Sequence, residues 1–169
     1  AGQHGVVTAD QIHENVRGDN PHFAPLSVVC IENTHNNYAG HAWSVEEASA
    51  VSAACREHDL KLHMDGARLF NAAVAMGVEA KEYTQYVDSV MFCVSKGLSA
   101  PLGSLLCGSN EFIEEAYRMR KRLGGAMRQA GVAAAAGIVA LEQMVDRLAE
   151  DHAVENQRAL QRLELVLVS

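Results

Sequence analysis

Two short segments of this chain carry side chains that could do chemistry together. Asp65 and Arg68 stand at the start of an expected helix, and Lys96 lies two residues after the apolar run Val87–Val94. An enzyme that uses pyridoxal phosphate (PLP) needs such a pair. The lysine amine forms a Schiff base with the cofactor aldehyde, and the carboxylate keeps the pyridine nitrogen protonated. Taken separately, each residue has a plainer explanation, because an aspartate before a helix is a good N-cap and a lysine after a strand is usually exposed.

The residues around this pair favour the cofactor interpretation. Lys96 is followed by Gly97, Ser99 and Gly103, and such small residues let a bulky planar cofactor approach the backbone. Arg68 lies one turn into the expected helix. It could be a surface arginine in an ion pair, or it could offer its donor fork to a carboxylate or to the cofactor phenolate.

Four histidines, His22, His35, His41 and His63, are candidates for a place in the site. His63 lies inside an expected strand, so we expect it to pack or to hydrogen-bond a neighbouring group. His35 could approach a cofactor or brace its own loop, while the spacing of His22 and His41 indicates nothing by itself. No pair of histidines has the spacing of zinc ligands, so we expect no metal site. The chain also lacks the G-x-S-x-G, G-x-G-x-x-G and P-loop patterns, which gives no support to a serine hydrolase or a nucleotide site.

The apolar runs predict the strands that must position these residues. They cover 27–31, 61–64, 87–94 and 104–107, and the first run is expected to be covered on both faces. Helices alternate with these strands, which predicts an α/β fold with a largely parallel sheet. At the carboxyl ends of the strands, the segments 32–36, 65–66 and 95–97 would then face one crevice.

Helix boundaries can be predicted from capping residues. Thr8 and Ser44 each open a capping box, and the second helix is expected to run to about Glu57. Asn110 is expected to cap a charged helix that continues to Arg122. Two further helices are expected over 67–76 and 127–152.

The composition is that of an ordinary globular protein. The 169 residues are 49% hydrophobic and 21% charged, with a net charge of -7 and a mean hydropathy of -0.05. This acidic balance gives no support to nucleic-acid or membrane-surface binding, and the basic run Arg118–Arg122 is local.

Cysteine usage and apolar runs bear on the compartment. Three of the four cysteines, Cys30, Cys93 and Cys107, lie in strand-like apolar runs and are expected to act as small hydrophobes. The absence of C-x-x-C spacing fits a reducing cytosol. With neither a signal peptide nor a long apolar run in the sequence, we expect a cytoplasmic protein of one domain.

Five motifs, in this order and spacing, carry a family resemblance. They are Glu32–Asn36, His63–Asn71, Ser95–Leu98, Pro101–Ser104 and Gly124–Gln129. On these motifs the chain resembles the threonine aldolases, which act with low specificity on L-threonine and L-allo-threonine. They form part of the aromatic amino acid β-eliminating lyase/threonine aldolase group of fold-type-I PLP enzymes. The resemblance covers roughly residues 5 to 152.

The resemblance implies a fold and a division of the chain. The fold would be the large domain of the aspartate aminotransferase-like PLP enzymes, with a largely parallel sheet flanked by helices, and incomplete. Residues 1–152 would form the central and C-terminal part of this PLP-binding domain. Residues 153–169 would begin a linker helix to an absent small domain, or form an unrelated tail.

The resemblance also implies a reaction and residue roles. PLP would support aldol cleavage of L-threonine or L-allo-threonine to glycine and acetaldehyde through a Schiff base on Lys96. Asp65 would partner the pyridine nitrogen, and His22 would lie near the substrate hydroxyl. Arg68 would contact both cofactor and substrate. Arg128 would reach a cofactor across a subunit boundary, so a homo-oligomer, a dimer or a tetramer, is expected.

Two other functions stay open at this point. The chain could belong to another fold-type-I PLP lyase, such as a β-eliminase. It could also be a catalytically silent fragment that only folds and self-associates. Lys96, Asp65 and Arg68 are all intact, which favours an enzyme that acts on a small β-hydroxy amino acid, with no nucleic-acid or membrane partner.

Overall fold

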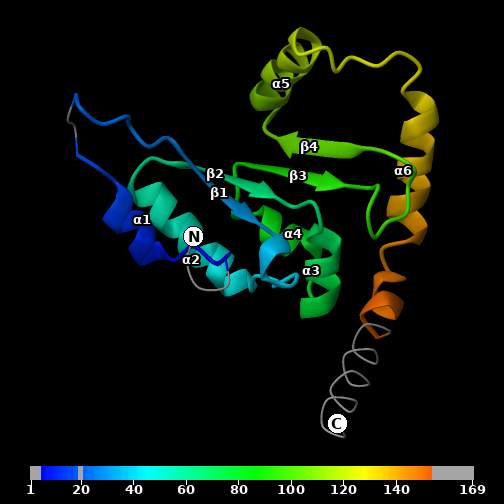
Figure 1. The fold of residues 1–169 in the computed structure, drawn as a ribbon, viewed down its shortest axis with the longest axis horizontal. Coiled ribbons are helices and arrows are strands. Elements are labelled where there is room, and N and C mark those ends of the chain that lie inside the picture. The colour runs from blue at the N-terminus through cyan, green and yellow to red at the C-terminus, as the bar shows by residue number, and fades with distance from the viewer. Residues whose placement is uncertain (1–4, 19–20, 154–169) are drawn as a thin grey trace, which may run out of the picture.

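The computed structural model describes residues 5–18 and 21–153 (Figure 1). Its helices are α1 (Ala9–Asn15), α2 (Val45–Glu57), α3 (Leu69–Met76), α4 (Ala80–Thr84), α5 (Asn110–Arg122) and α6 (Gly131–Gln143), with a 3-10 helix η2 (Asn36–Tyr38). Its strands are β1 (Val28–Glu32), β2 (Lys61–Asp65), β3 (Ser89–Cys93) and β4 (Ser104–Gly108). Within these described residues, no helix has both the length and the apolar character needed to cross a membrane.

The strands form one sheet in the order β1-β2-β3-β4. β1, β2 and β3 are parallel, and β4 runs antiparallel to β3. In the register, Glu32 of β1 pairs with Asp65 of β2, and Asp65 pairs with Met91 of β3. The prediction of an α/β fold with a largely parallel sheet is therefore confirmed.

The first core cluster lies on one face of this sheet, beneath α1–α4. Leu62 and Met64 of β2 point into it, together with Ile31 of β1, and the single tryptophan, Trp43, is fully buried there. Figure 1 shows α1 and α2 packed side by side on this side of the sheet. Alternation along the strands sends their other side chains to the opposite face.

That opposite face is open, so the prediction that residues 27–31 are covered on both faces is wrong. Val28 is 45% exposed and Cys30 is exposed, whereas Ile31 is buried. A groove of about 650 Å³ runs over this face, and its lining includes Val28, Cys30, His63 and Phe112. The prediction failed because a run as short as the four apolar residues 28–31 occurs both in strands covered on one face and in strands covered on both.

Cysteine burial also differs from the prediction. Cys30 and Cys107 lie on strands as expected but are exposed, and Cys93 is half-buried. The buried thiol is Cys55 on α2, and burial, with Asp88 nearby, raises its pKa. All four thiols are free.

Most capping predictions are confirmed. Thr8 with Gln11 and Ser44 with Glu47 form complete capping boxes at α1 and α2. At α5 the cap is Ser109 instead of Asn110, because the Ser109 hydroxyl accepts a hydrogen bond from the Phe112 amide at 3.2 Å.

The expected long helix over 127–152 is shorter in the structure. Gln129 has a left-handed backbone (φ 50), so α6 begins only at Gly131. After Gln143 the chain makes a tight turn, with a hydrogen bond from the Leu148 amide to the Val145 carbonyl, and it is helical again over 148–153. The turn brings Leu148 into the second core cluster, which consists of Val94, Leu98, Ala100, Ala140 and Leu148.

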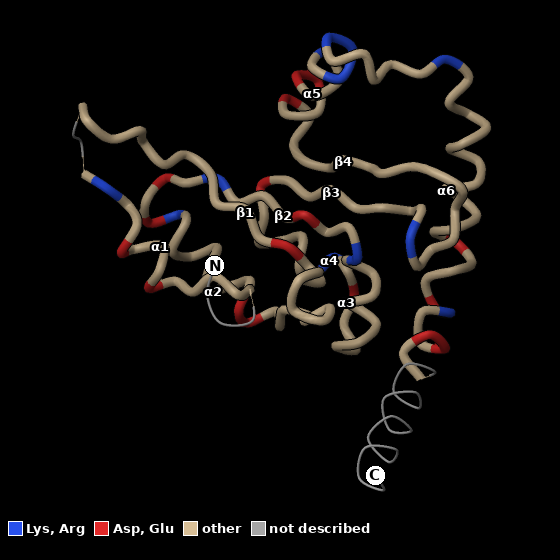
Figure 2. Tube along the Cα trace, in the orientation of Figure 1, with Lys and Arg blue, Asp and Glu red and all other residues tan. Residues whose placement is uncertain are grey.

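α5 projects from the sheet and contains no buried residue. Figure 2 shows basic residues gathered near its C-terminal end, away from the sheet. They include Arg120, whose guanidinium stacks over the Tyr117 ring at 5.0 Å. This arrangement is that of a solvated helix face.

Candidate active site

The three polar segments lie at one edge of the sheet. β1, β2 and β3 are adjacent and parallel, so their carboxyl ends bring residues 32–36, 65–66 and 95–97 to the same side of the molecule. The Asn33 amide donates to the Asp65 carbonyl at 2.8 Å, which extends the β1–β2 pairing to the start of the first segment. The sequence prediction of a shared edge is confirmed.

A rigid turn after β2 places Asp65. Its Oδ1 accepts a hydrogen bond from the Ala67 amide at 3.0 Å, and the Gly66 amide donates to the Met91 carbonyl at 2.7 Å. A Cβ on Gly66 would lie 2.9 Å from that carbonyl oxygen, so only glycine allows β2 and β3 to approach this closely. Because of this turn, α3 begins at Leu69 and not at Ala67.

Arg68 follows at the N-cap position of α3, where it is half-buried. Its Nη2 donates to Asn36 Oδ1 at 2.7 Å. The turn after β2 is therefore joined to the loop after β1 through these two side chains. This hydrogen bond uses part of the guanidinium fork and fixes the direction of the remainder.

The loop that carries Lys96 is closed by its own backbone. The Ser99 amide donates to the Lys96 carbonyl, and the Ala100 amide donates to the Val94 carbonyl, both at 2.9 Å. The Lys96 side chain is exposed. Across the described residues, no hydrogen bond or ion pair joins Lys96 to Asp65.

The lysine loop packs closely against the start of α3. Arg68 and Asn71 lie on one side of this contact and Gly97 and Leu98 on the other, and the space between them is too small for a water molecule. The structure therefore brings two of the predicted motifs into contact, and Lys96 stands next to this contact in the chain.

Sequence reasoning missed the support behind Asp65. Asn33 is fully buried, and its Oδ1 accepts a hydrogen bond from the Trp43 amide at 3.2 Å. The Tyr83 hydroxyl donates to the Trp43 carbonyl at 2.6 Å, and burial raises the pKa of this hydroxyl. These contacts hold the loop between Asn33 and Trp43 against the core. In the sequence, this support is indicated only by the position of Asn33, a polar residue immediately after β1.

Two histidines act as expected within the frame of the site. His63 Nδ1 and Ser89 Oγ lie 2.8 Å apart in a hydrogen bond between β2 and β3. The His35 ring packs edge-on against Tyr38, with ring centres 4.9 Å apart, and its Nδ1 lies 3.7 Å from a Glu32 carboxylate oxygen. His35 therefore braces its loop, one of the two roles left open for it.

Two predicted site residues lie elsewhere in this chain. His22 is exposed in the segment that enters β1 from its N-terminal end, and Figure 1 shows this segment (blue) extending away from α3. Arg128 is exposed in the connection between α5 and α6. Neither residue belongs to the contact between Arg68 and the lysine loop, and their roles stay predictions.

The fold and these motifs agree with known proteins. A family model described as Beta-eliminating lyase matches residues 1–169, and the chain belongs to this family. It is 48% identical over 148 residues to the low specificity L-threonine aldolase of Escherichia coli K12, and that match covers 88% of this chain and 44% of the relative. It is 50% identical over 125 residues to the low-specificity L-threonine aldolase 1 of Arabidopsis thaliana, with 74% and 35% coverage.

A solved structure shows the same fold. The crystal structure of a candidate L-allo-threonine aldolase from Listeria monocytogenes EGD-E superposes with a TM-score of 0.77 at 27% identity, covering 89% of this chain and 40% of that one. The family resemblance and the fold class predicted from the sequence are thereby confirmed. The chain spans less than half the length of these relatives.

Proposed function

We propose that this chain is part of a PLP-dependent lyase that cleaves L-threonine or L-allo-threonine into glycine and acetaldehyde. One observation carries the proposal. In a chain 48% identical to an L-threonine aldolase, the Asp65 turn and the Lys96 loop follow neighbouring parallel strands, and the lysine loop packs against the start of α3, which begins just after that turn. This is the edge of an α/β sheet at which ligands usually bind.

The residues present fit PLP. Asp65 offers a carboxylate that a single described hydrogen bond, from the Ala67 amide, leaves able to hold a proton on a ring nitrogen. Lys96 offers an exposed amine on a loop whose backbone holds it at this edge of the sheet. When bound, PLP supplies an electron-poor ring that takes up the electron pair of the breaking Cα–Cβ bond.

Each proposed role belongs to an atom of this chain. The Lys96 amine would hold the cofactor covalently before the substrate amine takes its place. The Asp65 carboxylate would keep the ring nitrogen protonated, and this electrostatic effect would lower the barrier to bond cleavage. Arg68, directed by Asn36, binds the substrate carboxylate with its remaining N–H groups.

Two further roles are proposed for exposed residues away from this contact. His22 or a bound water is proposed to take the proton of the substrate hydroxyl when the Cα–Cβ bond breaks and acetaldehyde leaves. Arg128 is proposed to contact the cofactor of a neighbouring subunit, in a homodimer or homotetramer.

The test begins with the covalent bond to Lys96. The purified chain is mixed with PLP and reduced with borohydride, and the modified lysine is mapped by mass spectrometry. We expect an adduct on Lys96 that Lys96→Ala abolishes, whereas the matched variant Lys81→Ala, at an exposed lysine on α4, keeps it. Adduct formation that survives Lys96→Ala would contradict the proposal.

A second assay separates the candidate reactions. Allo-threonine is added to the PLP-loaded chain, and the products are identified. Acetaldehyde and glycine are the expected products. Ammonia and a keto acid would identify a β-eliminase instead, and the absence of any product, with the adduct present, would identify a fragment that needs further segments of its family's chains.

A further inference from the structure

The loop that carries Lys96 rests directly on two other segments of the chain. A Cβ built on Gly97 would lie 2.8 Å from Leu148 Cδ2, and 3.1 and 3.2 Å from the Oδ1 and Nδ2 atoms of Asn71. Carbon atoms in good contact are about 3.5–4.0 Å apart, so no side chain fits between the loop backbone and these two residues. The φ angle of Gly97 is not positive, so its backbone conformation does not require glycine. Glycine is needed because the loop backbone approaches Leu148 and Asn71 so closely.

The surface beneath the loop is itself held in place. Leu148 is 1% exposed in the second core cluster, together with Val94 at the start of the lysine loop and Leu98 within it. One turn further along the helical segment 148–153, His152 Nε2 donates to the Asn71 carbonyl at 3.2 Å. We call Asn71, Leu148 and His152 the lysine-loop seat.

The seat also links the two halves of the site. Asn71 is one turn of α3 beyond Arg68, and α3 begins immediately after the turn that holds Asp65. If Asn71 were displaced, the segment that carries Asp65 would therefore shift relative to the loop that carries Lys96.

We propose that Asn71, Leu148 and His152 are positioning residues that fix the height and orientation of the Lys96 loop, and that Gly97 is required so that the loop can settle on them. This inference rests on the proposed function of Lys96. It predicts that damage to the seat changes the reactivity of the Lys96 amine more than it changes the stability of the rest of the chain.

The test compares matched pairs of substitutions in the full chain. Gly97→Ala is paired with Gly131→Ala, because a Cβ on Gly131 meets no atom within 4 Å and its φ is not positive. Leu148→Ala is paired with Leu60→Ala, a leucine that is 6% exposed in the first core cluster. Urea unfolding of each variant reports the stability of the whole chain.

Two local readouts are measured on these variants. The first is the rate at which PLP and borohydride label Lys96, and the second is hydrogen exchange of the Ser99 and Ala100 amides, which close the lysine loop. We expect Gly97→Ala and Leu148→Ala to slow labelling and to speed exchange by about tenfold each, while both controls stay near the parent chain.

Two further variants test the mechanism of the effect. In the double variant Gly97→Ala/Leu148→Ala, the atom that would contact the new methyl group most closely is gone. Labelling should therefore recover by about threefold over Gly97→Ala alone, a coupling that independent sites would not show. His152→Gln keeps a donor for the Asn71 carbonyl and should label like the parent chain, whereas His152→Ala should label more slowly.

The outcomes separate this inference from the proposed function. If Gly97→Ala and Leu148→Ala match their controls in both readouts, the seat does not position Lys96. If the parent chain gives no adduct on Lys96, the proposed function fails for this chain. In that case, hydrogen exchange of the Ser99 and Ala100 amides in Gly97→Ala and Leu148→Ala still tests whether the seat fixes the loop. Exchange as slow as in the parent chain would refute this inference.

Discussion

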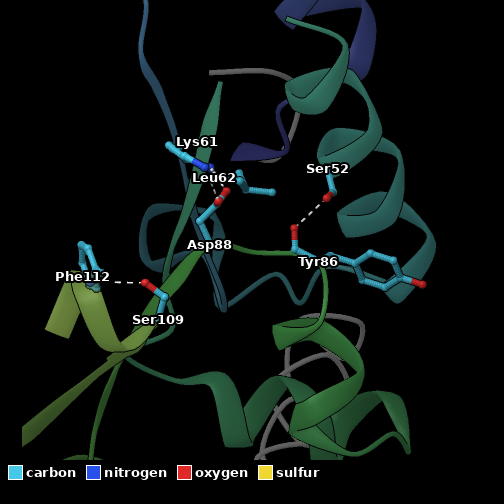
Figure 3. Close-up of polar contacts among 7 residues, drawn as sticks. All are labelled: Ser52, Lys61, Leu62, Tyr86, Asp88, Ser109 and Phe112. Carbon is cyan, nitrogen blue, oxygen red and sulfur yellow. Dashed lines mark hydrogen bonds and ion pairs between the residues drawn. The ribbon is translucent and has the colours of Figure 1, made fainter. Parts of the chain in front are cut away.

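Asp88 should be a strong stabilising residue although it lies at the sheet edge opposite the candidate site. Figure 3 shows its carboxylate between the Leu62 amide, which donates to Oδ2 at 2.9 Å, and the Lys61 ammonium, which donates to Oδ1 at 3.0 Å. A hydrogen bond to a charged acceptor contributes about 1.5–3 kcal/mol. The Lys61 side chain is 72% exposed and that of Asp88 44%, so water screens this pair and it adds only about 0–1 kcal/mol.

Asp88→Ala should therefore lower the free energy of unfolding by about 2 kcal/mol, mostly because the Leu62 amide loses its acceptor. Urea unfolding, followed by the fluorescence of Trp43, the single tryptophan of the chain, measures this directly. With a slope of about 2 kcal/mol per molar urea, the midpoint should fall by about 1 M. Lys61→Met, which removes only the screened pair, should lower the midpoint far less than Asp88→Ala does. A loss for Lys61→Met equal to that of Asp88→Ala would refute the reasoning.

The same carboxylate predicts a pH dependence. Partial burial disfavours its charged form, but hydrogen bonds from the Leu62 amide and Lys61 outweigh burial and lower the pKa of Asp88. Because the folded-state pKa is the lower one, ionised Asp88 stabilises the fold above the pKa of an unfolded aspartate, about 3.9. That contribution disappears as the pH falls through the folded-state value. The difference in unfolding free energy between the parent chain and Asp88→Asn should therefore shrink from pH 7 toward about pH 3.

Two further substitutions test the frame of the site. Gly66→Ala should cost about 1–3 kcal/mol, because its methyl group would lie against the Met91 carbonyl, whereas Gly18→Ala, which meets no atom within 4 Å, should stay within about 0.5 kcal/mol in the same urea assay. Tyr83→Phe should cost about 1–3 kcal/mol, because the Trp43 carbonyl loses its hydroxyl donor in the core. An unchanged unfolding midpoint for either Gly66→Ala or Tyr83→Phe would show that these contacts do not hold the loop ends.

Local signals in the sequence predicted most of the elements. The four-residue capping box from Ser44 to Glu47 marks the start of α2 in the sequence. The strands that end at Glu32 and Asp65 are predicted by short apolar runs. The shared edge of the candidate site followed from these strand ends, because parallel strands bring their carboxyl ends together.

The features that failed depend on residues far apart in the sequence. The turn that interrupts the expected helix over 127–152 is stabilised when Leu148 packs against Val94 and Leu98, and no local pattern contains that contact. The loop from Asn33 to Trp43 is likewise held by the Tyr83 hydroxyl, which comes from a helix 40 residues beyond Trp43. The motif order indicated Lys96 and its partners, but the surface on which the lysine loop rests could be seen only in three dimensions.

The two core clusters follow one another along the chain, and this order has a consequence for synthesis. All buried members of the first cluster lie between Ile12 and Val90, and all those of the second lie between Val94 and Leu148. A ribosome adds about 5–20 residues per second, so the first cluster can pack for several seconds before Leu148 emerges. The nascent protein would thus pack the half that holds Asp65 first, and the loop that carries Lys96 would come to rest on its seat only after Leu148 has emerged.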